Sequence, residues 1–240
     1  MLIDDITIRL KAGDVDLMVI FPKETSARKW KPILMQEFKG KNWLSESRKK
    51  PIVVHGAYIT SFQKLASELG LWQKDLLLRV IADALIVHDP QRQGEKLKKK
   101  YAWYPSRVAQ EKMNWLLAEA TFLLFDRYQI GMQRSSFFYI EGIKLKILKL
   151  LMASMAMAER RYPISSKHVQ ADAQRCINFR KANQIIDQVL REKNPVRIFS
   201  LLKEMRKNIE RALIKRKLIK KRDIPDWIGL RPKYKVEIEG

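Results

Sequence analysis

Two aspartates, Asp14 and Asp16, are the residues whose type and spacing best suit a chemical role. They stand at the start of the mostly apolar stretch 15–21, which has the pattern of a buried strand. Side chains alternate along a strand, so we expect both carboxylates on one face and Val15 on the other. Two carboxylates placed in this way can hold Mg²⁺, a hard cation that also bridges to substrate phosphates. The pair therefore predicts a magnesium site, and the alternative is the solvated start of a strand.

The overall charge narrows the class of partner. The chain has 240 residues and a formal net charge of +22, and 46% of its residues are hydrophobic. This hydrophobic share is typical of a folded globular protein, and such a positive excess attracts polyanions. A nucleoside triphosphate, RNA and an acidic partner protein are therefore the partners to consider, ahead of an anionic membrane surface. A generally basic proteome is the alternative explanation of the charge.

Several kinds of site are disfavoured by the residue types. The single cysteine, Cys176, allows no intrachain disulfide and no zinc site built from several thiolates. The three histidines are scattered without metal-ligand spacing. The sequence has neither the pattern of a signal peptide nor an uninterrupted apolar span. We therefore expect a cytoplasmic protein that does not enter a membrane.

A small sheet is needed to position the carboxylate pair. Residues 1–11 alternate between apolar and polar types and predict a half-buried strand. Residues 13–21 predict a second strand, and the β-branched and aromatic stretch 51–60 predicts a third. Residues 30–38 favour a helix and the polar stretch 45–50 favours a surface loop. The opening of the chain thus predicts a compact unit of strands and one helix.

Helical periodicity begins after Ser61, which can cap a helix that Gly70 ends. Residues 91–104 are predicted as a loop that holds four lysines beside aromatic residues. The other predicted helices cover residues 72–88, 106–130 and 135–160, two shorter segments from Ser166 and Ala182, and residues 195–221. The predicted fold class is therefore α+β, with a small mixed-sheet core at residues 1–61 and a larger α-helical domain at residues 62–240.

Later motifs follow the Asp-x-Asp strand in a definite order. A predicted helix ends in His-Asp-Pro at residues 88–90, Trp-Tyr-Pro occurs at 103–105, and a long predicted helix ends in Arg-Arg-Tyr-Pro at 160–163, followed by Lys167. This succession resembles that of bacterial and archaeal members of the nucleotidyltransferase superfamily, which have a polymerase-beta-like fold and a helical C-terminal domain. The resemblance covers residues 1–190 and rests on the order of the motifs more than on any single one.

The resemblance implies a magnesium-dependent enzyme that transfers a nucleoside monophosphate from a nucleoside triphosphate to a hydroxyl group of an RNA end, a protein or a small molecule. It implies that Asp14 and Asp16 are the catalytic metal ligands. It also implies that Gly13, Lys167 and, as a helper, Arg161 lie at the nucleotide. A lysine near a helix start suits phosphate, because its compact charge adds to the positive end of the helix dipole. The alternative is a helix-to-helix turn with a solvated lysine.

Two features depart from the family pattern. No Gly-Ser turn precedes Asp14, so the predicted core is short at its N-terminus. The strand at 51–60 also lacks the third acid that many members carry, and His55 is its only residue with the pKa of a general base. Packing is the alternative role for His55. Either another carboxylate completes the site, or catalysis is weak or lost; the carboxylates that could complete it are Asp4, Asp5, Glu37 and Glu46.

A second hypothesis is a catalytically degenerate protein of this fold that binds RNA or an acidic partner. Its support is the run of cations in the last helix and the lysine-rich loop, where stacking and phosphate contacts can coexist. The candidate nucleic-acid-binding residues are Lys98, Lys99, Lys100, Lys215, Arg216 and Lys220. A solvated face of a core helix is the alternative interpretation of those cations. A third hypothesis is an antitoxin-like protein that pairs with a toxin, which the sequence does not separate from the enzyme.

Overall fold

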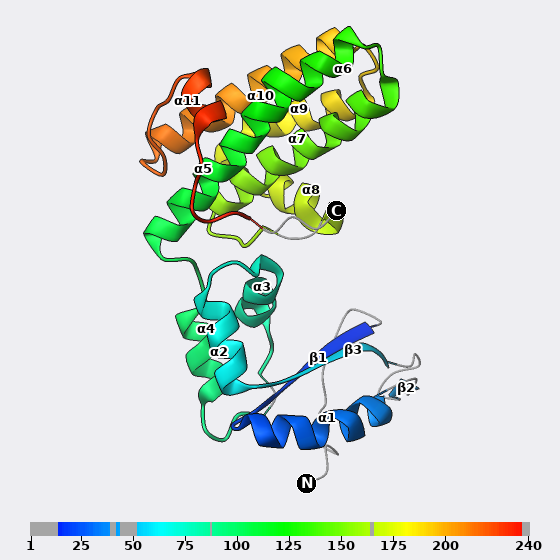
Figure 1. The fold of residues 1–240 in the computed structure, drawn as a ribbon, viewed down its shortest axis with the longest axis vertical. Helices are drawn as coiled ribbons and strands as arrows, with labels where there is room; N and C mark the ends of the chain where they lie inside the picture. The colour runs from blue at the N-terminus through cyan, green and yellow to red at the C-terminus, as the bar shows by residue number, and fades with distance from the viewer. Residues whose placement is uncertain (1–13, 39–41, 44–51, 87, 164–165, 237–240) are drawn as a thin grey trace. The chain divides into compact units, whose positions relative to one another are not determined.

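The computed structural model describes residues 14–38, 42–43, 52–86, 88–163 and 166–236 (Figure 1). For residues 14–17, 37–38, 42–43, 52–57 and 166–168 it describes the backbone alone. Packing divides the chain into a first unit, Met1–Leu71 with Ala84–Lys100, and a second unit, Trp72–Asp83 with Tyr101–Gly240. This division groups residues 84–100 with the unit that contains residues 1–61, the predicted core.

The first unit is built on a mixed three-stranded sheet of order β1-β3-β2. Strand β1 (Asp14–Phe21) pairs in parallel with β3 (Ile52–Ser61), and the short β2 (Asn42–Trp43) pairs with β3 in the antiparallel sense. Helix α1 (Glu24–Phe38) connects the two parallel strands. The predicted strands at 13–21 and 51–60 are confirmed, whereas the predicted strand at 1–11 lies outside the described residues.

Ser61 joins three elements of the first unit. Its hydroxyl accepts a hydrogen bond from the Lys64 amide at 3.2 Å, which caps α2 (Phe62–Gly70) as the sequence predicts. The same hydroxyl donates to the Glu24 carboxylate at 2.5 Å, in the first turn of α1. This hydrogen bond is the main cause that holds the pKa of Glu24 below its usual range. One buried serine thus ties the end of β3 to the starts of α1 and α2.

The lysine-rich segment forms helix α4 (Gln93–Lys100), so the predicted loop at 91–104 is wrong over these residues. The Asp89 carboxylate explains where the helix starts, since it accepts from the amides of Gln93 at 2.8 Å and Glu95 at 2.9 Å. Leu97 is buried and holds one face of α4 against the unit. Asp89 of the His-Asp-Pro motif therefore starts a helix, and the predicted helix end at this motif is wrong because α3 already ends at Asp83.

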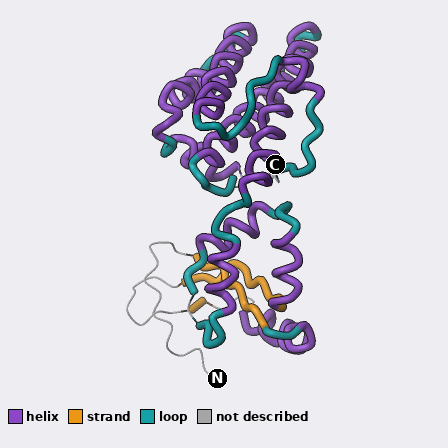
Figure 2. Tube along the Cα trace, turned by 90° about the vertical axis from the view of Figure 1, so that its left-hand side faces the viewer, coloured by secondary structure: helices purple, strands orange, loops and turns teal. Residues whose placement is uncertain are grey.

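The second unit is helical, and among the described residues the strands belong to the first unit (Figure 2). Helix α5 packs against α7, and α10 packs against both α7 and α9. Its elements are α3 (Asp75–Asp83), α5 (Ser106–Phe122), the π-helical turn η1 (Leu123–Tyr128), α6 (Gln129–Gln133), α7 (Phe137–Ala158), α8 (Ser166–Gln174), the 3₁₀ turn η2 (Ile177–Phe179), α9 (Arg180–Arg191), α10 (Pro195–Lys215) and α11 (Ile224–Gly229). The helices predicted near 106–130 and 135–160 are confirmed.

Two predicted helices end earlier than expected. Helix α3 stops at Asp83 rather than residue 88, and the Ala84 carbonyl accepts a hydrogen bond from Lys98 Nζ at 2.7 Å instead of continuing a helical ladder. Helix α10 stops at Lys215 rather than residue 221, because Lys217 takes a left-handed backbone with φ of 58°. The amides of Lys217 and Leu218 then close on the last turn at 2.8 and 2.9 Å.

A buried ion pair lies in the core of the second unit. Lys112 and Asp75 have fully buried side chains, and Lys112 Nζ donates to the two carboxylate oxygens at 2.9 and 3.1 Å. Lys112 also donates to the Lys235 carbonyl at 2.6 Å, and the Tyr104 hydroxyl donates to Asp75. These contacts join α3, α5 and the C-terminal segment. Over the described residues, no helix is long and apolar enough to cross a bilayer.

Candidate functional site

The Asp-x-Asp pair occupies the first and third positions of β1. Asp14 is opposite Val53 of β3 and Asp16 is opposite Gly56. The register shifts between Val15 and Asp16, and it passes over His55. This irregularity is a β-bulge, a feature that is common beside active sites. The backbone therefore places the two aspartates and the only histidine of β3 in one short stretch of the same ladder.

The residue types of this stretch fit a hard divalent cation. Asp14 and Asp16 offer carboxylate oxygens two positions apart on one strand, which is the donor chemistry that Mg²⁺ prefers. Their side chains and that of His55 lie outside the described part of the structure. Among the side chains that are described, no group of three His, Cys, Asp or Glu residues is placed to hold a metal.

The other carboxylates proposed for the metal site cannot be placed as ligands. Glu37 lies in the last turn of α1, the helix that crosses from β1 to β3, and only its backbone is described. Asp4, Asp5, Glu46 and the predicted nucleotide contact Gly13 lie outside the described residues. These assignments stay predictions.

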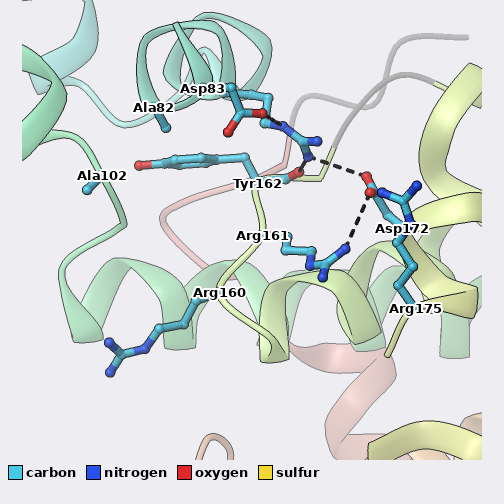
Figure 3. Close-up of a pocket in the computed structure, with 9 residues that line it drawn as sticks. Ala82, Asp83, Ala102, Arg160, Arg161, Tyr162, Asp172 and Arg175 are labelled. Carbon is cyan, nitrogen blue, oxygen red and sulfur yellow. Dashed lines mark hydrogen bonds and ion pairs between the residues drawn. The ribbon is translucent and has the colours of Figure 1, made fainter. Parts of the chain in front are cut away.

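A cavity of about 230 Å³ lies in the second unit, at the Arg-Arg-Tyr motif (Figure 3). Four guanidinium groups and two carboxylates line it, which leaves a formal excess of two positive charges. We call this cavity the arginine pocket. Its lining residues are Arg79, Ala82, Asp83, Ala102, Arg160, Arg161, Tyr162, Asp172 and Arg175.

Asp172 organises one wall of the arginine pocket. Its side chain is only 6% exposed and accepts a hydrogen bond from Arg79 Nη1 at 3.3 Å. Arg161 Nη1 forms an ion pair with it at 3.8 Å. Arg79 also donates to the Tyr162 carbonyl at 3.1 Å and pairs with Asp83. Arg161 points toward Asp172 in Figure 3, whereas the guanidinium of Arg160 points away from it. Among the described residues, Arg160 and Arg175 make no ion pair.

The aromatic residue of the motif anchors the turn that carries these arginines. Tyr162 is buried, its hydroxyl donates to the Tyr101 carbonyl at 2.8 Å, and its ring lies 4.6 Å from that of Tyr104. Burial raises the pKa of the Tyr162 phenol far above its usual range, so it stays protonated. Arg160 has a left-handed φ of 56°, which ends α7 and turns the chain. Tyr162 therefore positions the motif.

Lys167 is the second residue of α8, and its side chain is not described. The same helix carries Asp172, so the backbone places Lys167 on an element that forms a wall of the arginine pocket.

Sequence reasoning missed Arg79, Asp172 and Arg175. The sequence contains no signal for them, since Arg79 and Asp172 lie 93 positions apart and meet only in the folded chain.

The candidate nucleic-acid-binding residues lie on two separate elements. On α4, Lys98 donates to the Ala84 carbonyl, and Lys99 and Lys100 are exposed at the end of the helix. Near the end of α10, Lys215 and Lys220 are exposed. Arg216 differs from these, because its Nη1 pairs with Glu159 at 2.8 Å.

Comparisons with known proteins give little beyond this geometry. No protein-family model matches the chain, and no curated protein matches it. A structural match is the crystal structure of a nucleotidyltransferase-like protein from Exiguobacterium sibiricum 255-15, with a TM-score of 0.41 and 16% sequence identity. The match covers 74% of this chain and 57% of that protein, so this chain spans little more than half its length. A likeness at this TM-score carries no argument about the site.

Proposed function

We propose that the chain is a magnesium-dependent nucleotidyltransferase that moves a nucleoside monophosphate from a nucleoside triphosphate to a hydroxyl group. One observation carries the proposal: Asp14 and Asp16 lie on the first strand of a β1-α1-β3 crossover, beside the bulge that contains His55. This is the strand on which the resemblance in sequence expects the metal ligands. The bulge supports the assignment because it singles out the part of β3 nearest to them.

Asp14, Asp16 and His55 are each assigned one role in the reaction. Asp14 and Asp16 hold the cation, which neutralises charge on the phosphates when it is bound. The acceptor oxygen forms a bond to the α-phosphorus, and the bond from that phosphorus to the bridging oxygen breaks, so that pyrophosphate leaves. His55 takes the proton of the acceptor hydroxyl as the general base. Positioning and charge stabilisation supply most of the catalysis in reactions of this kind.

Arg161 and Lys167 are assigned to the phosphates of the nucleotide. The arginine pocket supports this part of the proposal, because it gathers four arginines against two aspartates in a cavity of about 230 Å³. Guanidinium groups bind phosphate oxygens through paired hydrogen bonds. The assignment of the pocket and that of the carboxylate strand stand on separate observations and are tested separately.

A binding protein without catalysis is the second candidate. The specific observation in its favour is that β3 contains His55 but no Asp or Glu, so the strand beside Asp14 and Asp16 brings no third carboxylate. In that case the chain binds RNA or an acidic partner through its cations. Removing Asp14 and Asp16 would then leave binding unchanged.

The proposal is tested by calorimetric titration of each nucleoside triphosphate, with and without Mg²⁺. We expect binding that depends on Mg²⁺ and disappears in the double variant Asp14→Asn, Asp16→Asn. A matched control removes two exposed carboxylates elsewhere, Asp187→Asn with Glu204→Gln, and should bind as the wild type does. The proposal would be contradicted if the affinity for the triphosphate did not depend on Mg²⁺. Equal affinity of the Asp14→Asn, Asp16→Asn variant and its control would also contradict it.

A third variant tests the arginine pocket by itself. Arg161→Gln should weaken binding of the triphosphate about tenfold or more, the loss expected for one charge-assisted contact of about 1.5–3 kcal/mol. The control is Arg107→Gln, an exposed arginine that pairs with Glu111 outside the pocket. If Arg161→Gln binds the triphosphate as its control does, the pocket is not the phosphate site, while the carboxylate assignment stands.

A further inference from the structure

Four exposed cations follow one another along α10 at intervals of four residues: Lys203, Lys207, Arg211 and Lys215. We call them the α10 band. Residues four apart on a helix are neighbours on its surface, separated by a rise of about 6 Å. The band therefore presents a positive charge at a regular step over about 18 Å. Lys217, Lys220 and Lys221 continue the exposed positive charge past the end of the helix.

The helix that carries the band is a rigid support. Its other face is fully buried at Ile198, Leu202, Met205, Ile209 and Leu213. Helix α10 packs against α7 and α9 along this face (Figure 1). The core of the second unit therefore holds the backbone of the four cations in place.

The carboxylates around α10 are engaged with other groups. Glu210 pairs with the buried Arg206 at 3.1 Å and accepts from the Trp227 indole at 2.9 Å. Glu159 pairs with Arg216, and Asp223 and Asp226 form the capping box of α11. In the described part of the chain, none of the four cations of the band forms an ion pair, since no carboxylate lies within 4.0 Å of them. Two acids lie between the four cations in the sequence, and of these Glu204 is exposed and Glu210 is partly buried.

A line of evenly spaced cations is complementary to a polymer of evenly spaced anions. A nucleic acid strand carries one phosphate per about 3.4 Å, so a strand laid along the band presents about five phosphates over its length. Every nucleotide of the strand carries a charge, so a flexible strand can adjust to the step of the band, whereas an acidic protein segment needs carboxylates at matching positions of a helix or strand. From the spacing, the exposure and the absence of ion pairs we propose that the α10 band binds the backbone of RNA, without reading its bases.

The choice of RNA rests on the proposed function in one respect. A nucleotidyltransferase needs an acceptor hydroxyl, and RNA offers hydroxyl groups at its end and along its backbone. On this reading the acceptor is RNA, and the band contacts it through its phosphates alone. Binding of RNA by the band does not require Asp14 and Asp16, which keeps the two proposals separable.

The test measures fluorescence anisotropy of a labelled oligoribonucleotide of 20 residues over a range of salt concentrations. The variant replaces all four band residues: Lys203→Gln, Lys207→Gln, Arg211→Gln and Lys215→Gln. The control removes four exposed cations of the first unit and changes the net charge equally: Lys23→Gln, Lys29→Gln, Lys31→Gln and Lys64→Gln. All eight side chains are exposed, so both variants should keep the circular dichroism spectrum of the wild type.

We expect the band variant to bind the oligoribonucleotide at least tenfold more weakly, and the control to change affinity less than threefold. The slope of log affinity against log salt should fall by about 3 in the band variant, since each lost phosphate contact removes about 0.7. Equal weakening in both variants would mean that net charge alone attracts RNA, and would overturn the proposal. Unchanged binding in the band variant would overturn it too.

Two further measurements distinguish RNA binding by the α10 band from nucleotide binding at the aspartates and from binding of other polyanions. The variant Asp14→Asn, Asp16→Asn should bind RNA as the wild type does, so failure of nucleotide binding contradicts the proposed function and leaves the band intact. A DNA oligonucleotide of the same sequence, and a polyglutamate of equal charge, should not bind more tightly than the RNA. Tighter binding of either would reassign the band and overturn the choice of RNA.

Discussion

The two units assemble their candidate sites in different ways. In the first unit the chemistry is local, because Asp14 and Asp16 are two positions apart and His55 joins them through the register of the neighbouring strand. In the second unit the charged groups come from α3, from the turn after α7 and from α8, as the Arg79–Asp172 pair shows. The first arrangement can be found in a sequence, and the second exists only in the fold.

The second unit also holds ion pairs where water does not reach them. The Lys112–Asp75 pair is fully buried, whereas pairs such as Lys146–Glu119 lie on the surface. Breaking a buried pair leaves a charge without a partner or water, and breaking an exposed pair does not.

Lys112→Met should lower the free energy of unfolding by about 3–5 kcal/mol, because it leaves the Asp75 carboxylate buried without its cation. Lys146→Met, the matched control, should cost at most about 1 kcal/mol, since the side chain of Lys146 is 56% exposed. Urea denaturation measures both. Similar losses of unfolding free energy in the two variants would show that burial does not make the Lys112–Asp75 pair more important for stability than an exposed pair.

Asp172→Asn should have two opposite effects on the arginine pocket. It should lower the free energy of unfolding by about 1–3 kcal/mol, because Arg79 loses a buried charged acceptor and Arg161 loses the partner of its ion pair. It should also raise the affinity of the protein for inorganic pyrophosphate about two- to fivefold, as one negative charge leaves the wall of the cavity. Denaturation and calorimetry measure the two. Weaker binding of pyrophosphate would show that Asp172 helps to hold the anion.

Ser61→Ala should cost about 1 kcal/mol in the free energy of unfolding, because it removes the cap of α2 and the hydrogen bond to Glu24. Ser200→Ala is the control, since Ser200 is exposed and bonds only within α10. Chemical denaturation at neutral pH compares the two variants. Equal losses would show that Ser61 does not tie its three elements together.

The effect of Ser61→Ala should also depend on pH. The Ser61 hydroxyl holds the pKa of Glu24 below its usual value of 4.5, so this contribution is present above that value and is lost as the pH falls through the folded pKa. The difference between wild type and variant should therefore shrink in acid. Denaturation curves at neutral and acidic pH measure the change, and a difference that grows in acid would contradict the assigned cause.

Much of the fold could be predicted where local signals are strong. The β-branched and apolar strands at Asp14–Phe21 and Ile52–Ser61 and the Ser61 cap are examples. Helix α4 was missed because most of its residues are polar or lysine and only Leu97 is buried, so no apolar periodicity appears in the sequence. Its cap, Asp89, also lies four residues before the helix. The end of α10 was missed because a lysine, not a glycine, takes the left-handed position. Both boundaries are set by local hydrogen bonds that the usual capping patterns do not reveal.

Whether Asp14 and Asp16 hold a metal can be measured by electron paramagnetic resonance, with paramagnetic Mn²⁺ as a substitute for Mg²⁺ and in the presence of ATP. We expect the wild type and the Asp187→Asn, Glu204→Gln control to bind Mn²⁺ and ATP together, which lowers the Mn²⁺ signal from solution. With the Asp14→Asn, Asp16→Asn variant, we expect the Mn²⁺ signal to equal that of a solution of Mn²⁺ and ATP without protein. Equal binding by this variant and the wild type would mean that the Asp-x-Asp strand does not hold the metal.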